Sequence, residues 1–315
     1  MRRHFSRRLF LGYSGAVAGA LALPALARAN QASTPDAATP SAGMSDQPMI
    51  RVEVTGGFAP IQLLNSALPT FVMYPDGRVI TQGPVPAIFP APALPNLRES
   101  ALTQEGIRTV LTAAEEAGLI GQDRHIHHGQ IVDAPTTYIT VTVDSRTTRT
   151  SVYAMTIDDD PNWTDEEREA VAKIRDFYNK TLDIFGWLPE TAFERRDETF
   201  QIEQLQIIAE PYPKTEATPD DPATNQPPMD WPLSTPLSAL TGVTLQGLPD
   251  TTRCFVFSGE EARTLVAALQ QANELTPWVS EGNRYRLMVR PLLPGESGCP
   301  PPSPLWDPEM ATPTA

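Results

Sequence analysis

Three histidines lie close together in the sequence and could bind a metal ion. They are His125, His127 and His128, with Asp123 just before them. Imidazole nitrogens bind Zn²⁺, Cu²⁺ or Ni²⁺, and Asp123 or Asp133 could add an oxygen ligand. Positions i, i+2 and i+3 cannot all face one side of a strand, so convergence requires a loop, and a loop is predicted here. The alternative is a solvated polar loop that binds nothing. We favour this alternative and expect no cofactor, because no second cluster of His or Cys exists in the sequence.

The two cysteines of the chain, Cys254 and Cys299, are predicted to form a disulfide. In an oxidising compartment an even pair of cysteines is most simply a bridge. Its loop of about 45 residues would contribute roughly 3–4 kcal/mol of stability. Two free thiols or a catalytic cysteine are the alternatives, but neither cysteine has a histidine near it in the sequence.

The densest acidic run comprises three aspartates at 158–160 and the acids at 165–167. The calcium-binding spacing of an EF-hand, with its central glycine, is absent. Acids near a helix N-terminus favour the helix dipole, and Glu167 completes a capping box with Thr164. The run therefore indicates the start of a surface helix.

Motifs for catalysis are missing from the sequence. It contains no G-x-S-x-G elbow, S-x-x-K, H-E-x-x-H or P-loop, and no G-x-G-x-x-G follows a predicted strand. We therefore expect no enzyme activity. A secreted hydrolase with dispersed acidic residues stays open as an alternative, because paired carboxylates need no local motif.

The order of the predicted strands and helices, which must position these residues, indicates an α+β fold. It consists of two small domains, each a mostly antiparallel sheet with one or two packed helices. In the first, strands are expected at 50–54, 71–74, 78–80, 138–143 and 150–153, and helices begin at Thr103, ending near Gly118, and at Thr164. In the second, strands are expected at 200–208, 253–257 and 285–289, with a helix at 258–272 capped by Ser258 and Glu261.

Stretches rich in Pro, Ala, Ser and Thr divide the chain. Proline accounts for 33 of 315 residues, about twice its usual share. The predicted parts are a signal peptide (1–29), a disordered tether (30–48), an N-terminal domain (49–195), the first strand of the second domain (196–212), a Pro-rich linker or long loop (213–228), a C-terminal domain (229–299) and a disordered tail (300–315).

The first 29 residues predict export. Arg7 and Arg8 resemble the arginine pair of a twin-arginine signal, and Ala27 and Ala29 offer the small-x-small pattern of a cleavage site. The apolar run between them is too short for a membrane-spanning helix, so no membrane insertion is expected after cleavage. Removing this segment, which holds five arginines and no acid, takes the net charge from −14 to −19. Such a charge argues against nucleic acid and anionic lipid as partners. The expected location is periplasmic, cell wall or secreted.

Several motifs along the mature chain resemble those of one protein family. In the first half they are Gly56-Gly57-Phe58, Leu68-Pro69-x-Phe71, Asp76-Gly77-Arg78, PALPNL at 92–97 and DAPTT at 133–137; in the second half they are Ser258-Gly259, AN-x-LTPW at 272–278, Tyr285 and RPLLP at 290–294. With these motifs the chain is similar to a family of uncharacterised exported proteins, often lipoproteins, of actinobacteria and Chloroflexi. The resemblance implies the layout and the compartment, but no activity and no functional residues. Lipid anchoring is not implied, since the chain has no lipobox cysteine.

Together these features predict an exported, non-catalytic protein that binds a protein or cell-envelope partner through sheet faces and loops. The alternatives are an extracytoplasmic metal-binding protein using the histidine cluster, and the hydrolase.

Overall fold

The structure is a computed structural model that describes residues 46–157, 159–212, 225–245 and 247–299. The predicted signal peptide, with Arg7, Arg8, Ala27 and Ala29, lies outside the described residues. So do the predicted tail and most of the predicted tether and linker. The described residues all belong to one compact unit.

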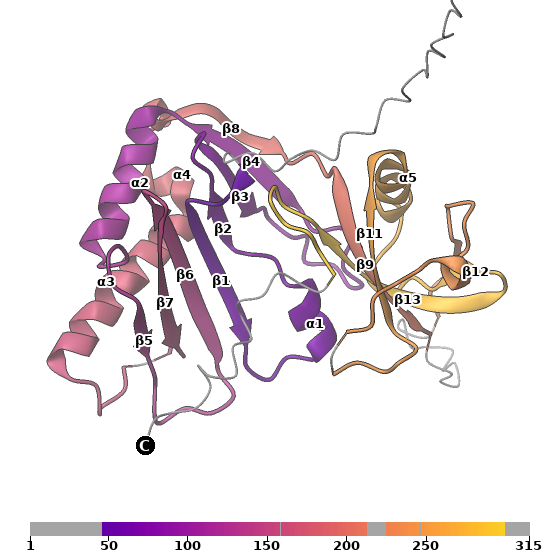
Figure 1. Cartoon of the computed structure of the whole chain (residues 1–315), viewed down its shortest axis with the longest axis horizontal. Coiled ribbons are helices and arrows are strands. Elements are labelled where there is room, and N and C mark those ends of the chain that lie inside the picture. The colour runs from indigo at the N-terminus through magenta and orange to yellow at the C-terminus, as the bar shows by residue number, and fades with distance from the viewer. Residues whose placement is uncertain (1–45, 158, 213–224, 246, 300–315) are drawn as a thin grey trace, which may run out of the picture. The chain divides into compact units, whose positions relative to one another are not determined.

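The predicted α+β class is confirmed (Figure 1). Two mostly antiparallel sheets, of eight and five strands, are accompanied by few helices. The first sheet ends at Thr199 and the second begins at Gln204. The division into two domains stays a prediction.

The first sheet has the strand order β5-β7-β6-β1-β2-β3-β4-β8. Every neighbouring pair is antiparallel except β5 with β7. The predicted hairpin of β2 and β3 turns at Gly77, whose φ of 87° suits a residue without Cβ. The strands are β1 (Ile50–Gly56), β2 (Phe71–Met73), β3 (Arg78–Gln82), β4 (Leu97–Leu102), β5 (Arg124–Ile126), β6 (Pro135–Val143), β7 (Arg146–Tyr153) and β8 (Phe193–Thr199).

Helices α2 (Gln104–Glu116) and α3 (Asp165–Leu182) cover one face of this sheet (Figure 1). Their predicted starts are confirmed: the Thr103 side chain accepts a hydrogen bond from the Gly106 N–H, and Thr164 forms a capping box with Glu167. The two short helices of this part are α1 (Ile61–Ser66) and α4 (Ile184–Trp187). The apolar stripes of α2 and α3 bury the inward side chains of β1, β2, β6 and β7, and this forms the larger core.

The second sheet has the order β10-β12-β13-β9-β11, with only β10 and β12 parallel among these pairs. Helix α5 packs on one face, where Ala262, Leu265 and Leu269 are buried. The elements are β9 (Gln204–Pro211), β10 (Met229–Asp230), β11 (Arg253–Ser258), α5 (Gly259–Leu269), β12 (Trp278–Ser280) and β13 (Asn283–Pro291).

Three local expectations in the second half were wrong. Strand β9 begins at Gln204, because Phe200 still belongs with the first sheet and its N–H donates to Leu97 O (3.0 Å). Helix α5 ends at Leu269, because the Gln271 and Ala272 N–H groups donate to the carbonyls three residues earlier in place of the helical bonds to the fourth. The Ser258 side chain makes no capping hydrogen bond. Gly259 has a φ of 60°, which changes the direction in which the chain enters the helix.

Strand β8 was not predicted as part of the first sheet, since residues 196–199 were assigned to the first strand of the second domain. Its sequence, FERRDET, is charged and largely exposed, so it has no apolar alternation to indicate a strand. It is a strand because it pairs with β4, and its charges suit the edge of a sheet.

The segment that follows β13, residues 292–299, folds back against the first sheet, and we call it the return segment. The Tyr74 hydroxyl donates to Pro294 O (3.1 Å), and Leu293 packs beside Tyr74. The carboxylate of Glu296 accepts two hydrogen bonds of 2.7 Å from Arg290 and lies 2.9 Å from the Arg51 guanidinium. Cys299 is paired with Cys254, at a Cα–Cα distance of 5.7 Å that agrees with the predicted disulfide.

None of the helices in the described ranges has the length and apolar composition that crossing a bilayer requires.

Candidate functional site

The segment that contains the histidines was predicted to be a loop. This prediction was wrong, because part of the segment forms strand β5. This strand was missed because three residues, Arg-His-Ile, are too few to show a periodic pattern. It lies beside β7, with His125 opposite Ser151. Successive side chains of a strand point to opposite faces, so Ile126 is buried in the larger core whereas His125 and His127 are exposed on the other face.

The third histidine, His128, points inward and is buried. It is 3% exposed, and its ring lies edge-on to the Trp163 ring with centroids 5.3 Å apart. Its Nδ1 is 3.5 Å from Oδ2 of Asp160. Oδ2 also accepts a hydrogen bond from the Gly129 N–H, and Oδ1 accepts one from the Asn162 N–H. The Asn162 N–H is the main reason that the pKa of Asp160 lies below its usual range, and Gly129 N–H adds to it against the effect of burial. The Gly129–Asp160 bond and the bond from Trp163 Nε1 to His127 O (2.8 Å) thus hold two loops together.

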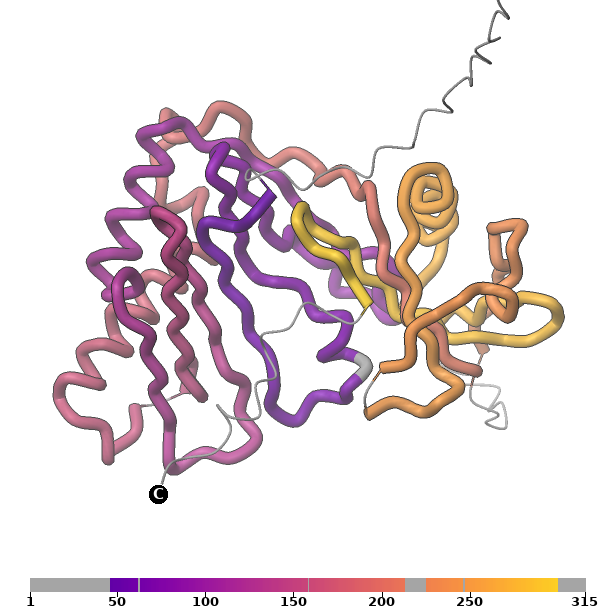
Figure 2. Tube along the Cα trace, in the orientation of Figure 1, coloured from indigo at the N-terminus to yellow at the C-terminus, as the bar shows by residue number. Residues whose placement is uncertain are grey.

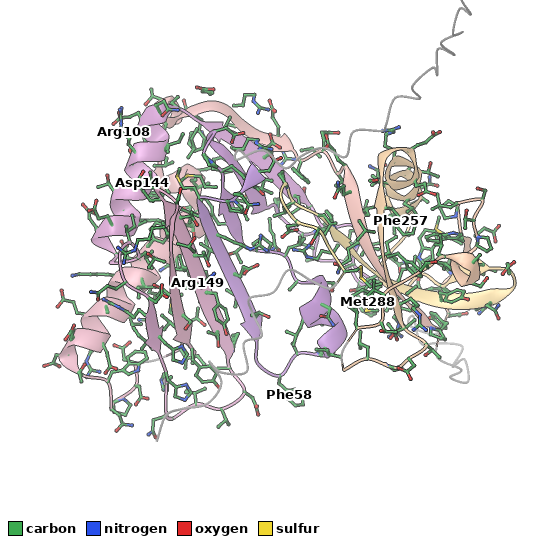
Figure 3. The ribbon with its side chains drawn as sticks, in the orientation of Figure 1. Phe58, Arg108, Asp144, Arg149, Phe257 and Met288 are labelled. Carbon is green, nitrogen blue, oxygen red and sulfur yellow. A yellow bond between two sulfur atoms is a disulfide. The ribbon has the colours of Figure 1, made fainter. Side chains whose placement is uncertain are left out.

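The face of the first sheet opposite α2 and α3 is its outer face, and the part of it over β1, β6, β7 and β5 is polar. Cross-strand register places these side chains in rows. We call them the open face: Thr55, Thr136, Tyr153 and His127 in the first row, Glu53, Tyr138, Ser151 and His125 in the second, and Arg51, Thr140 and Arg149 in the third. The strands run side by side along the chain trace (Figure 2), and Figure 3 marks Arg149 on β7.

The open face is most accessible at its β5 and β7 edge, whereas the Arg51 and Glu53 side chains on β1 are only 16% and 13% exposed and Ser151 is buried. His125, His127 and Arg149 are exposed, and Tyr138 and Tyr153 are partly exposed. None of the apolar clusters formed by the described residues includes any side chain of this face.

Hydrogen bonds and ring contacts fix the side chains of the open face. The Tyr153 and His127 rings stack with centroids 5.0 Å apart and planes inclined by 16°. The Tyr153 hydroxyl also accepts a hydrogen bond from Ala134 N–H (3.0 Å). Asp123, the fourth predicted metal ligand, accepts a hydrogen bond from Arg149 N–H (2.8 Å) and so supports β7. The face is therefore ordered before any partner binds.

His125 is held close to Ser151, with its Nδ1 within hydrogen-bonding distance of Ser151 Oγ. Partial burial, and then the nearby His127, lower the pKa of His125. Both effects favour the neutral imidazole, which can donate through one ring nitrogen and accept through the other.

The structure does not bring the predicted metal ligands together. His125 and His127 share the open face, His128 is buried on the opposite side, and Asp123 binds backbone. Within the described part of the chain, no group of three or more His, Cys, Asp or Glu side chains is arranged to hold a metal ion.

A shallow hollow between α2 and α3 is lined by Glu116, Ala117, Glu169, Ala172, Lys173 and Asp176. A general acid for hydrolysis needs a raised pKa. Here the hydrogen bond and charge of Lys173, 2.7 Å away, lower the pKa of Glu169. Asp176 pairs with Lys180 at 2.8 Å. Glu169 and Asp176 are therefore engaged in surface ion pairs, and Glu169 lacks the raised pKa that a general acid needs.

Sequence reasoning missed the aromatic and cationic members of the open face, above all Tyr138, Tyr153 and Arg149. The signal was present in β6, where Thr136, Tyr138, Thr140 and Thr142 alternate with residues of the opposite face. Period-two alternation predicts such a half-exposed strand. It does not show which other strands lie beside it.

Comparison with known proteins gave no match to a family model, to a curated protein or to a solved structure.

Proposed function

We propose that this chain is an exported, non-catalytic protein that binds a protein partner of the cell envelope through the open face. The observation that carries the proposal is the open face itself. It is a rigid, hydrogen-bonded sheet surface on which Tyr138, Tyr153 and Arg149 stand among threonines.

The composition of this face suits protein recognition. Tyrosine and arginine dominate the residues whose truncation weakens protein interfaces most. Tyrosine also supplies a large contact area at a low entropic cost, since it has only two side-chain torsions. The stacking of Tyr153 on His127 reduces that cost further, because the ring is already oriented.

Two features support export. The first 29 residues resemble a twin-arginine signal with a cleavage site, and the motifs of the mature chain resemble those of exported proteins. Cys254 and Cys299 lie at disulfide distance, and disulfides persist in oxidising compartments.

The test is retention of an envelope protein by immobilised mature chain (residues 30–315). Three forms are compared: the wild type, the double variant Tyr138→Ala with Tyr153→Ala, and the control Arg108→Ala, which changes an exposed side chain on α2. We expect a partner that is kept by the wild type and the control and lost by the double variant.

Calorimetry with the purified partner should then show about tenfold weaker binding for each single tyrosine variant. The proposal fails if the same partner is retained equally by all three forms, or if no envelope protein is retained by the wild type under mild crosslinking. Fractionation of the producing cells tests export separately: mature chain found only in the cytoplasm contradicts it.

A further inference from the structure

The loop between β3 and β4 exposes three large apolar side chains within a few residues of one another. Val85 is 65% exposed, Ile88 61% and Phe89 71%. We call residues 84–90 the apolar loop; its sequence is PVPAIFP. Scattered single apolar residues are normal on a surface, but three in one short loop are a marker of an interaction site.

Hydrogen bonds anchor the apolar loop at both ends. At its start, Gly83 N–H donates to Asn96 O (2.7 Å), and the Asn96 side chain donates to Pro84 O (2.9 Å). After its end, Ala91 N–H donates to the Glu274 carboxylate (3.0 Å), and Glu274 N–H donates back to Ala91 O (2.9 Å). The exposed side chains therefore stand on a fixed base, and a partner would not have to order the loop.

The chemistry of the loop restricts what it can bind. Residues 83–97 contain no Asp, Glu, Lys or Arg, so electrostatic attraction contributes little. Pro84, Pro86 and Pro90 have no N–H, so this stretch cannot add a regular strand to the edge of another sheet. What remains is burial of apolar side chains on a proline-stiffened backbone. Aromatic-lined grooves recognise such segments.

A lipid surface is a poorer fit for the loop. The chain carries a formal net charge of −14, and −19 without residues 1–29, which repels anionic headgroups. Membrane-surface segments compensate by carrying clusters of Lys or Arg, and the loop has none.

We propose that the apolar loop docks into an apolar, aromatic-lined groove of a partner protein. The inference names a partner class for the proposed binding function and in that sense rests on it. It uses a surface different from the open face, so the loop proposal can fail while the open-face proposal stands.

The experiment places photoreactive p-benzoyl-phenylalanine at Phe89 in the mature chain and crosslinks it in envelope extract. The matched control carries the same group at Phe58, which is also aromatic and 95% exposed but stands on the loop after β1 (Figure 3). We expect a protein adduct from position 89 and none of that mass from position 58. A synthetic peptide of residues 82–97 should compete with the adduct.

The captured protein must then be purified and titrated with the mature chain. We expect Phe89→Asp to weaken binding about tenfold or more, while its urea unfolding midpoint matches the wild type because the side chain is exposed. Equal binding by Phe89→Asp would overturn the loop proposal. If Tyr138→Ala alone weakens binding, the open-face function stands and the loop proposal fails.

Three other outcomes also overturn the loop proposal. One is the absence of any adduct from position 89, and another is an adduct only with a second copy of the chain. The third is flotation of the wild type, but not of Phe89→Asp, with phosphatidylcholine–phosphatidylglycerol vesicles, which would assign the loop to a lipid surface.

Discussion

The outer face of the first sheet has two halves with opposite chemistry. Over β2, β3 and β4 it presents Val72, Tyr74, Ile80 and Leu97, which are buried beneath Phe200 and Leu293. Over β1, β6, β7 and β5 the same face presents threonine, tyrosine, histidine and arginine, with no apolar cover from the described residues. The two halves share one hydrogen-bonded sheet, so the difference comes from what packs on them.

Arg51 lies at the border between the halves. On β1 it is the cross-strand neighbour of Val72 on one side and of Thr140 on the other. Its guanidinium contacts Glu53 and, in the return segment, Glu296. The comparison shows that the ion pairs of Arg51 with Glu53 and Glu296 lie at the boundary between the covered half and the open face.

The largest effect is expected from Glu296→Gln, which removes the charge that holds the return segment on the covered half. Glu296 is paired with Arg290, whose side chain is 2% exposed, and with Arg51. Because the change leaves the buried Arg290 guanidinium without its carboxylate, and leaves Arg51 with Glu53 alone, we expect a loss of about 3–5 kcal/mol in the free energy of unfolding. Urea unfolding measures it. The control Glu105→Gln breaks an exposed pair and should cost less than about 1 kcal/mol.

Acid unfolding provides a second readout of the same group. Burial alone would raise the pKa of Glu296, but the hydrogen bonds and charge of Arg290, with the charge of Arg51, lower it overall. Its contribution is therefore full above the unfolded pKa of about 4.3 and lost as pH falls through the lower folded value. Equal acid sensitivity of the wild type and Glu296→Gln would contradict this assignment.

The next effect is expected from the double variant Cys254→Ser with Cys299→Ser, which frees the end of the return segment. The closed loop spans 45 residues, so its removal should cost about 3–4 kcal/mol. Urea unfolding of oxidised and reduced wild type gives the matched comparison. An unchanged unfolding midpoint after reduction would show that the bridge does not stabilise the cover.

A direct comparison of the halves uses one truncation on each. Ile80→Ala removes a side chain that is 2% exposed on the covered half and should cost about 2–4 kcal/mol. Tyr138→Ala, on the open half, should cost less than about 1 kcal/mol, since its side chain is partly in solvent. Similar losses for both variants would mean that the open half is also covered.

The smallest effect is expected from His125 on the open face. Because its folded pKa lies below the unfolded value of about 6.5, the unfolded chain binds more protons near that pH. Stability should therefore fall slightly as pH drops through that value. His125→Asn should flatten this slope between pH 5 and 7 in thermal unfolding. If the substitution leaves the dependence of stability on pH unchanged, that dependence comes from other titrating groups.

Much of the local structure could be predicted because its causes lie within a few residues. Thr103 and Thr164 cap their helices through the adjacent N–H groups, and Gly118 takes a φ of 70° at the end of α2. Strands β5 and β8 could not be predicted, since each depends on a neighbour far along the chain. His125 pairs with Ser151, and Phe193 with Leu102.

The candidate site could be predicted only in part. The histidine cluster led to the right segment, but not to the separation of His128 from His125 and His127. That separation follows from strand alternation, once β7 has made residues 124–126 a strand. The aromatic side chains that complete the open face come from β6 and β7, and their register with His125 exists only in the sheet.

The sequence by itself determined the α+β class, the starts of α2 and α3, the β2–β3 hairpin and the cysteine pair, because turn chemistry, capping and residue alternation act over short distances. Only the tertiary structure decided which half of the outer face is buried. Phe200, Arg290, Leu293 and Glu296 reach that face from more than a hundred residues beyond β2 and β3. Such apolar and ionic contacts depend on which residues are close in space. The spacing of residues along the chain does not reveal this when the partners are far apart in sequence.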